Sequence, residues 1–199
     1  MGQFDRPSRG ELETVFGSNG VAGQRGEAAF KGLLRNARLP YQYWHSLDLP
    51  RTAQHQHPTK ADLDFAMANG RRLALVDVKA WAGGFLRFSV PGLNMVAEVP
   101  TSGRRPANRA TPLKLSASMS MARDRYREAL PGIEIMAMVI FVRANGSPPP
   151  GNVSLLIWPG RIRSYKTGLG LTKIEDFLGS PEPIDPSLSL MLDRLKRKT

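Results

Sequence analysis

Four charged side chains interrupt two neighbouring apolar stretches of the sequence. Asp62 and Asp64 lie in the first stretch, and Asp77 and Lys79 lie in the second. Aspartate and lysine are seldom buried without a partner, so each needs a compensating interaction. Carboxylates that converge on one patch repel each other unless a cation balances them, and such oxygen ligands suit Mg²⁺. The metal would polarise a phosphodiester and activate water, while a lysine would position that water or offset charge in the transition state.

The two stretches are predicted to form one β-hairpin. Asn69-Gly70 lies between them, and this dipeptide between alternating apolar residues is a strong hairpin signal. A turn there makes available a register that pairs Asp64 with Asp77, and paired residues share a face of the sheet. We therefore expect an apolar face and a polar face. The apolar face would hold Leu63, Phe65, Ala74, Val76 and Val78, and the polar face Asp62, Asp64, Asp77 and Lys79. The alternative is an edge strand with a solvated face on which Asp77 pairs with Lys79.

Helices and further strands are predicted around this hairpin. A helix should begin at Gln24, with Glu27 in its first turn, and end before Pro40; the helix macrodipole alone would also favour a glutamate there. We expect other helices within 113–130, 172–179 and 186–199, and strands within 41–50, 85–90, 93–100, 133–143 and 153–158. This order indicates an α/β (α+β) fold in which helices flank a central mixed sheet. We divide the chain into a flexible arm (1–22), one domain (23–180) and a basic C-terminal helix (181–199).

Composition indicates the class of partner. The chain has 28 Lys and Arg against 17 Asp and Glu, a net charge of +11 and a pI near 10.5, which favours polyanions such as nucleic acid. Without cysteine, disulfides and thiolate-bound zinc are excluded.

No apolar stretch approaches the roughly 20 residues of a membrane span, and no signal segment is evident, so a cytoplasmic protein without a membrane partner is expected. His55 and His57 are interpreted as part of a solvated loop.

Three segments together resemble the PD-(D/E)XK nuclease superfamily and, within it, the nuclease-related domain (NERD) family. They are GQRGEAAF, ADLDF and VDVKAW, and the likeness covers roughly residues 23–143. The positions that correspond are Gly26-Glu27, Asp62/Asp64-Phe65, Asp77-x-Lys79, Trp81 and Gly83-Gly84. The chain departs from the family in having Asp77 where glutamate is usual. It also lacks the usual glutamine at the start of the later helix, where Lys114 or Ser116 stands.

The resemblance implies a restriction-endonuclease-like core and a metal-dependent hydrolase. By that likeness Glu27, Asp64 and Asp77 would bind Mg²⁺ or Mn²⁺, and Lys79 would be the catalytic lysine. The implied activity is hydrolysis of phosphodiester bonds in nucleic acid, with DNA as the expected substrate.

Basic side chains are predicted to contact the nucleic acid. Arg104, Arg105, Arg109 and Lys114 would meet phosphates, and Trp81 would stack on a base. The helix within 113–130 adds Arg123, Arg125 and Arg127. Because no helix-turn-helix or zinc finger is recognisable, we expect low sequence specificity. In the C-terminal helix, Leu188, Leu190, Met191 and Leu195 should dock while Arg194, Lys196, Arg197 and Lys198 face solvent.

Two other functions remain open on the sequence. One is a binding module of the same fold that holds nucleic acid without cutting it. The other is a component of a nucleoprotein assembly, such as a phage or mobile-element particle. The complete set of Glu27, Asp64, Asp77 and Lys79 favours the enzyme. DNA or RNA, endonuclease or exonuclease, and monomer or homodimer are alternatives that the sequence leaves open.

Overall fold

The computed structural model describes residues 18–57, 61–81, 85–89, 94–98, 112–113, 115–143, 154–157 and 162–197. In these residues helices pack on a six-stranded sheet, and a three-stranded sheet stands apart from it. The helices are α2 (Ser18–Ala37), α3 (Leu115–Ala129), α4 (Thr167–Leu178) and α5 (Pro186–Leu195). The main sheet contains β1 (Gln42–Asp48), β2 (Asp62–Asn69), β3 (Arg72–Trp81), β7 (Glu134–Arg143), β8 (Ser154–Ile157) and β9 (Ile162–Lys166).

The main sheet is mixed, as the sequence predicts. Its strand order is β1-β2-β3-β7-β9-β8. The three central strands β3, β7 and β9 are parallel, and the other neighbours are antiparallel. The α+β class is therefore confirmed.

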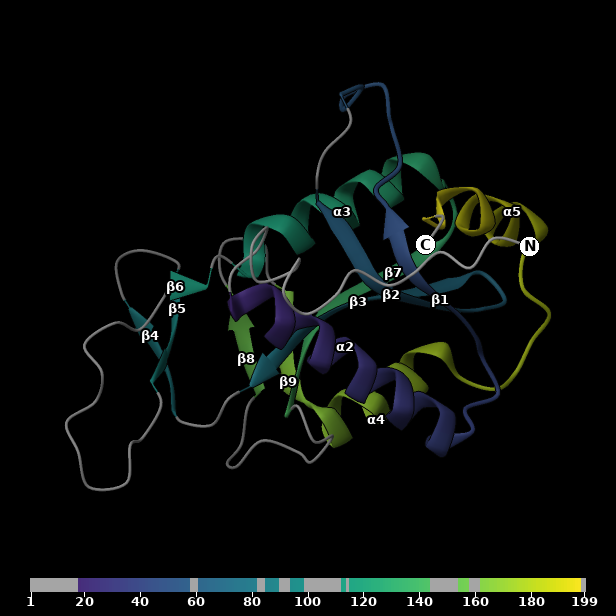
Figure 1. Ribbon diagram of the computed structural model, residues 1–199. Coiled ribbons are helices and arrows are strands. Elements are labelled where there is room, and N and C mark those ends of the chain that lie inside the picture. The colour runs from purple at the N-terminus through teal and green to yellow at the C-terminus, as the bar shows by residue number, and fades with distance from the viewer. Residues whose placement is uncertain are drawn as a thin grey trace, which may run out of the picture.

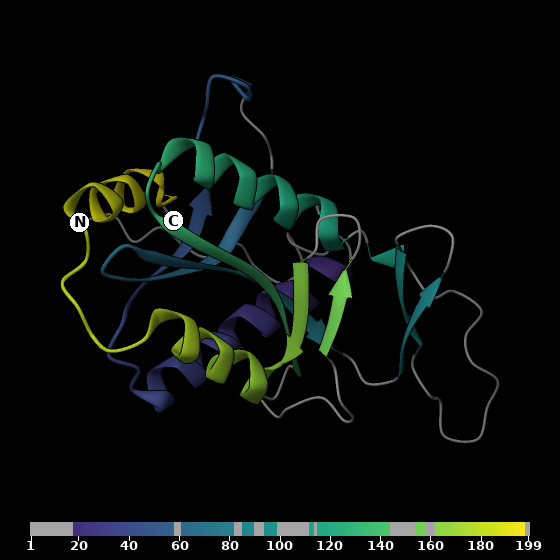
Figure 2. The same cartoon turned by 180° about the vertical axis from the view of Figure 1, so that it is seen from behind.

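Helices cover both faces of this sheet, which explains the continuous apolar runs of its central strands (Figures 1 and 2). Phe30 of α2 and Ile174 of α4 are fully buried against one face, in a cluster that includes Val76. Tyr126 of α3 and Leu188 of α5 are fully buried against the other face. Among the described helices, none has both the length and the apolar character that crossing a bilayer demands.

The predicted hairpin at Asn69-Gly70 is confirmed. Gly70 has φ of +54°, the left-handed conformation that a tight turn needs and that glycine adopts without strain. The antiparallel register runs from Asn69↔Arg72 to Phe65↔Val76. Continued by one step, this register is the predicted one, in which Asp64 comes opposite Asp77.

The ends of the chain differ from the prediction. The first helix begins at Ser18, so residues 18–22 belong to α2 rather than to an arm; residues 1–17 lie outside the described residues. In α5 the buried side chains are Leu188 and Leu192, whereas Leu190, predicted to dock, is 52% exposed. Leu188 and Leu192 are one turn apart, and Leu190 between them faces away from the sheet.

The segment between β3 and α3 contributes the second sheet, which consists of β4 (Phe85–Ser89), β5 (Asn94–Glu98) and β6 (Pro112–Leu113). Its strands are antiparallel neighbours in that order. Both ribbon views draw it beside the main sheet (Figures 1 and 2).

Candidate active site

The strands β2 and β3 separate where the site is predicted. Their pairing ends at Phe65↔Val76, while β2 continues along β1 as far as Asp48↔Asp62. Asp64 lies at this fork, and its Oδ2 accepts a hydrogen bond of 2.6 Å from the backbone N–H of Val78. The carboxylate therefore occupies a position that a backbone carbonyl would take in a continuous ladder.

Asp77 and Lys79 of β3 lie beside this fork. They are two residues apart and so point to the same side of the strand. The Nζ of Lys79 donates to Oδ1 of Asp77 at 2.6 Å. Asp77 is only 7% exposed, and its Oδ2 is buried with no hydrogen-bond partner among the residues that the structure describes. A buried carboxylate oxygen without a donor is costly, and a bound cation would satisfy it.

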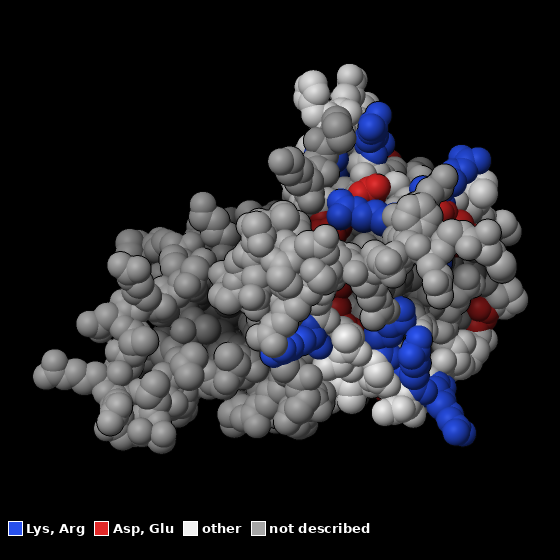
Figure 3. Space-filling view, in the orientation of Figure 1, with Lys and Arg blue, Asp and Glu red and all other residues white. Residues whose placement is uncertain are grey.

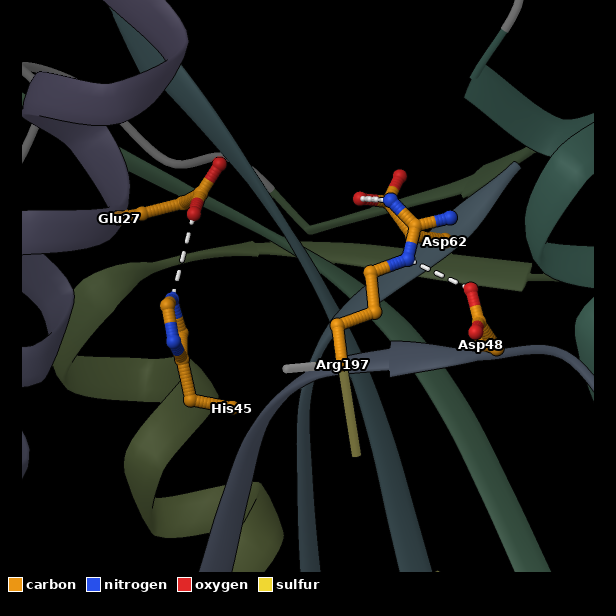
Figure 4. A network of polar contacts seen from close by, with 5 residues as sticks. All are labelled: Glu27, His45, Asp48, Asp62 and Arg197. Carbon is orange, nitrogen blue, oxygen red and sulfur yellow. Dashed lines mark hydrogen bonds and ion pairs between the residues drawn. The ribbon is translucent and has the colours of Figure 1, made fainter. Parts of the chain in front are cut away.

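Glu27 reaches the same site from α2. Because α2 begins at Ser18, Glu27 lies in the middle of the helix, and the first turn contains no acidic residue. The macrodipole, which acts within the terminal turns, therefore does not account for Glu27. Its Oε2 lies 3.3 Å from Nε2 of His45 in β1, the pair that Figure 4 draws on the left.

The charges of these four groups influence one another. Burial raises the pKa of Asp64 well above its usual value, and the nearby carboxylates of Asp77 and Glu27 raise it further, against the opposing charge of Lys79. Burial alone would lower the pKa of Lys79, but the carboxylates of Asp77 and Asp64 outweigh this effect and the pKa is raised. The structure thus brings together three carboxylates and one ammonium group, an excess of negative charge in a largely buried place.

The excess of negative charge and the oxygen ligands suit a hard divalent cation. As the side chains stand, no three His, Asp or Glu residues of the described ranges lie close enough to enclose a metal ion. Oδ1 of Asp77 and Oδ2 of Asp64 each accept a hydrogen bond from the protein, whereas Oδ2 of Asp77 has no donor in the described ranges. Mg²⁺ commonly takes only one or two protein carboxylates and keeps water for its other ligands. Asp64 and Asp77 are therefore suitable ligands, with Glu27 as the third candidate.

Asp62, predicted to lie on the polar face of the hairpin as a flanking residue rather than a metal ligand, binds an arginine in the structure. Its Oδ2 accepts a hydrogen bond of 2.9 Å from Nη1 of Arg197, and Nε of the same arginine donates to Asp48 (Figure 4). Arg197, predicted to face solvent, instead joins the C-terminal segment to the ends of β1 and β2.

Leu63 also lies on the other face than predicted. It is buried with Leu47 in the cluster beneath α3 and α5, not with Phe65. The cause is local. Ser46 lies between the pairs His45↔Phe65 and Leu47↔Leu63 and has φ of +56°, which breaks the regular alternation of side chains at this step.

His45 is a member of the site that the sequence did not reveal. It pairs with Phe65 across β1 and β2, next to Asp64, and its ring centre lies 4.8 Å from that of Phe65. Its approach to Glu27 depends on β1 lying beside β2 and on α2 crossing nearby. His45 lies in the aromatic segment 41–50, for which the sequence predicts only a short strand. Nothing in that segment indicates its contact with β2 or with α2.

Most of the predicted nucleic-acid contacts fall outside the described residues. This holds for Arg104, Arg105, Arg109 and Lys114, and for the side chain of Trp81, whose backbone ends β3. Arg125 cannot face a phosphate backbone as predicted, because it is only 5% exposed and its Nη1 donates to the carbonyl of Pro50. Arg127 is exposed.

Comparisons of this chain with protein-family models, with curated proteins and with solved structures found no match. The likeness to PD-(D/E)XK nucleases therefore rests on the residues of the chain, four of which, Glu27, Asp64, Asp77 and Lys79, lie within electrostatic reach of one another.

Proposed function

We propose that this protein is a metal-dependent nuclease whose active site lies at the fork between β2 and β3. The observation that supports the proposal most strongly is the buried Oδ2 of Asp77, which lacks a donor within the described ranges and lies near two further carboxylates and a lysine. A structural charge cluster would be expected to balance its charges, whereas a site for a cation and a phosphodiester gains its missing partners on binding.

In this proposal each side chain has a separate role. Asp64 and Asp77, with Glu27, would hold Mg²⁺ or Mn²⁺, which when bound polarises the phosphodiester and lowers the pKa of the attacking water. Lys79 has a raised pKa and is therefore a cation at neutral pH. It would offset the negative charge that develops on the phosphate oxygens rather than take a proton from water.

The substrate class follows from charge. A net charge of +11 favours a polyanion, and phosphate contacts by Lys and Arg give affinity without reading the base sequence. We expect DNA as the substrate and low sequence specificity. A non-catalytic module of the same fold, alone or within a nucleoprotein assembly, would bind the same polymer. It would gain stability by losing one of the crowded carboxylates, which is why the enzyme is favoured.

The test is cleavage by purified protein of supercoiled plasmid, linear duplex and single-stranded DNA, each with Mg²⁺, Mn²⁺ or EDTA. The variants Asp64→Asn, Asp77→Asn and Lys79→Ala should lose metal-dependent cleavage. Asp62→Asn is a matched control, because Asp62 lies on the same strand as Asp64 but is exposed and paired with Arg197. The control should cut like the wild type.

Two results would overturn the nuclease. One is unchanged cleavage by the folded Asp77→Asn and Lys79→Ala proteins. The other is salt-sensitive DNA binding by the wild type with no cleavage under any metal condition, which would establish the binding module instead.

A further inference from the structure

A row of charged residues runs along α2 away from the candidate site. Glu27, Lys31 and Arg35 are four residues apart, so they lie on one side of the helix on successive turns, and Arg38 follows directly after the helix. With a rise of 1.5 Å per residue, Lys31 and Arg38 are separated by about 10 Å along the axis. This length corresponds to about three nucleotides of one DNA strand at about 3.4 Å each.

No acidic residue of the described part of the chain neutralises the three cations of this row. Arg35 and Arg38 are exposed and Lys31 is half-buried, and none forms an ion pair with another residue of the described ranges. Lys31 is placed for a helical ion pair with Glu27, but Oε2 of Glu27 faces His45 instead. In Figure 3, Lys and Arg side chains follow the diagonal course that α2 takes in Figure 1.

The row is held in a fixed relation to the site. Phe30 and Leu34, on the neighbouring side of α2, are buried against the face of the sheet that contains Val76 and Val78. A ligand bound along Lys31, Arg35 and Arg38 would thus lie at a set distance from Glu27. The row leads from the site toward the hairpin end of the sheet, since α2 is followed by β1, whose Gln42 pairs with Ala68.

A purely structural role explains only part of this row. Arg35 lies in the last turn of α2, where a cation stabilises the helix dipole. Lys31 lies outside the last turn and gains nothing from that effect, and Arg38 lies beyond the helix. Three unpaired cations side by side repel one another, so their grouping is better explained by an anionic ligand.

We propose that Lys31, Arg35 and Arg38 form a phosphate track, on which the backbone of a nucleic-acid strand lies as it enters the active site. The inference rests on the proposed function for its substrate class. Its test measures binding without cleavage, so the two can fail separately.

The experiment is the binding of a fluorescent DNA duplex and of the corresponding single strand in EDTA, measured by anisotropy over a series of salt concentrations. The track variant is Lys31→Gln/Arg35→Gln/Arg38→Asn. Asparagine is chosen at residue 38 because Arg38 has φ of +49°, a conformation that asparagine tolerates. The matched control is Arg51→Gln/Arg194→Gln/Lys196→Gln. It removes three exposed cations, and thus the same net charge, away from α2.

The track variant should bind at least about tenfold more weakly at low salt, and the slope of log K against log[salt] should fall by about 2 to 3, one contact per lost cation. The control should change affinity much less. The phosphate track would be overturned if both variants lost DNA affinity equally, or if the track variant lost none. It would also be overturned if the wild type bound neither the duplex nor the single strand. Strong wild-type binding that depends on the track, without cleavage in Mg²⁺ or Mn²⁺, would retain the track and overturn the nuclease.

Discussion

The two ends of the β2–β3 hairpin both bury polar side chains, but in opposite states. At the turn, Asn69 is 3% exposed and its amide is satisfied on both sides. Its Nδ2 donates to the carbonyls of Leu178 and Ser180 at 2.8 and 2.6 Å, and its Oδ1 accepts from the N–H of Glu182 at 2.6 Å. At the fork, one carboxylate oxygen of Asp77 is buried without a donor from any described residue.

We interpret this difference as that between a structural polar group at the turn and the proposed functional group at the fork. A neutral amide with its partners supplied by the protein ties the hairpin to the end of α4 and the segment after it, and needs no ligand. The site has three carboxylates, of Glu27, Asp64 and Asp77, against the one positive charge of Lys79. This imbalance reduces the stability of the fold when no cation is bound. Substitutions at the turn should therefore cost stability, and substitutions at the fork should cost activity.

The largest effect is expected at the fork. Asp77→Asn and Lys79→Ala should each lower the initial rate of plasmid cleavage by about 10²–10³-fold, because the first removes a ligand of the proposed metal ion and the second removes the cation that offsets charge on the reacting phosphate. Both variants should remain folded, as judged by circular dichroism. If either variant cut at a rate within about threefold of the wild type, the fork would not differ from the turn in the way proposed.

At the turn the effect should appear in stability. Asn69→Ala removes three hydrogen bonds made by a buried amide, so the free energy of unfolding should fall by about 2–4 kcal/mol. Urea denaturation measures this loss. The cleavage rate per folded molecule should stay unchanged, and a loss of activity without a loss of stability would contradict the structural role of Asn69.

Asp64→Asn should sharpen the contrast by stabilising the protein in EDTA. The pKa of Asp64 is raised in the fold, so wild-type stability declines as pH rises from the ordinary carboxyl value of 3.8 through the raised value. Asparagine carries no charge, and its side-chain carbonyl can still accept from Val78. The midpoint of thermal unfolding, measured against pH, should be higher for the variant at neutral pH and converge with the wild type in acid. If the variant were less stable than the wild type at every pH, the charged form of Asp64 would not destabilise the fold as proposed for the protein without metal.

The smallest effect is expected at His45. His45→Ala should raise the metal concentration needed for half-maximal cleavage by about tenfold, because Glu27 loses the side chain that orients it. His45→Gln retains a donor and should recover most of the loss. If glutamine and alanine behave alike, His45 does not position Glu27.

The sequence predicts the hairpin, and the grouping of Asp64, Asp77 and Lys79 within it, because both depend on local patterns. Asn69-Gly70 specifies the turn, and the alternation of β3 places Asp77 and Lys79 on one side. What it missed depends on non-local geometry. The positive φ of Ser46 redirects Leu63, and Arg197 binds Asp62 across the fold.

The start of α2 and the strand β9 were missed because of their composition. The first turns of α2 contain Gly20 and Gly23, which obscure a helical pattern, so the helix was predicted to begin too late. The strand β9, with the sequence IRSYK, is too short and too charged to be distinguished from a loop, yet it pairs with β7 in the sheet.

The most direct test of the account is thermal unfolding of the wild type and of Asp77→Asn with and without Mg²⁺ or Mn²⁺. If the unbalanced carboxylates form a cation site, metal should raise the midpoint temperature of the wild type. The corresponding gain in the free energy of unfolding is about 2.7 kcal/mol at a metal concentration 100 times the dissociation constant. The Asp77→Asn protein should respond little. A wild type unmoved by either metal, or a variant stabilised as much as the wild type, would contradict the assignment of this fork as a metal-dependent active site.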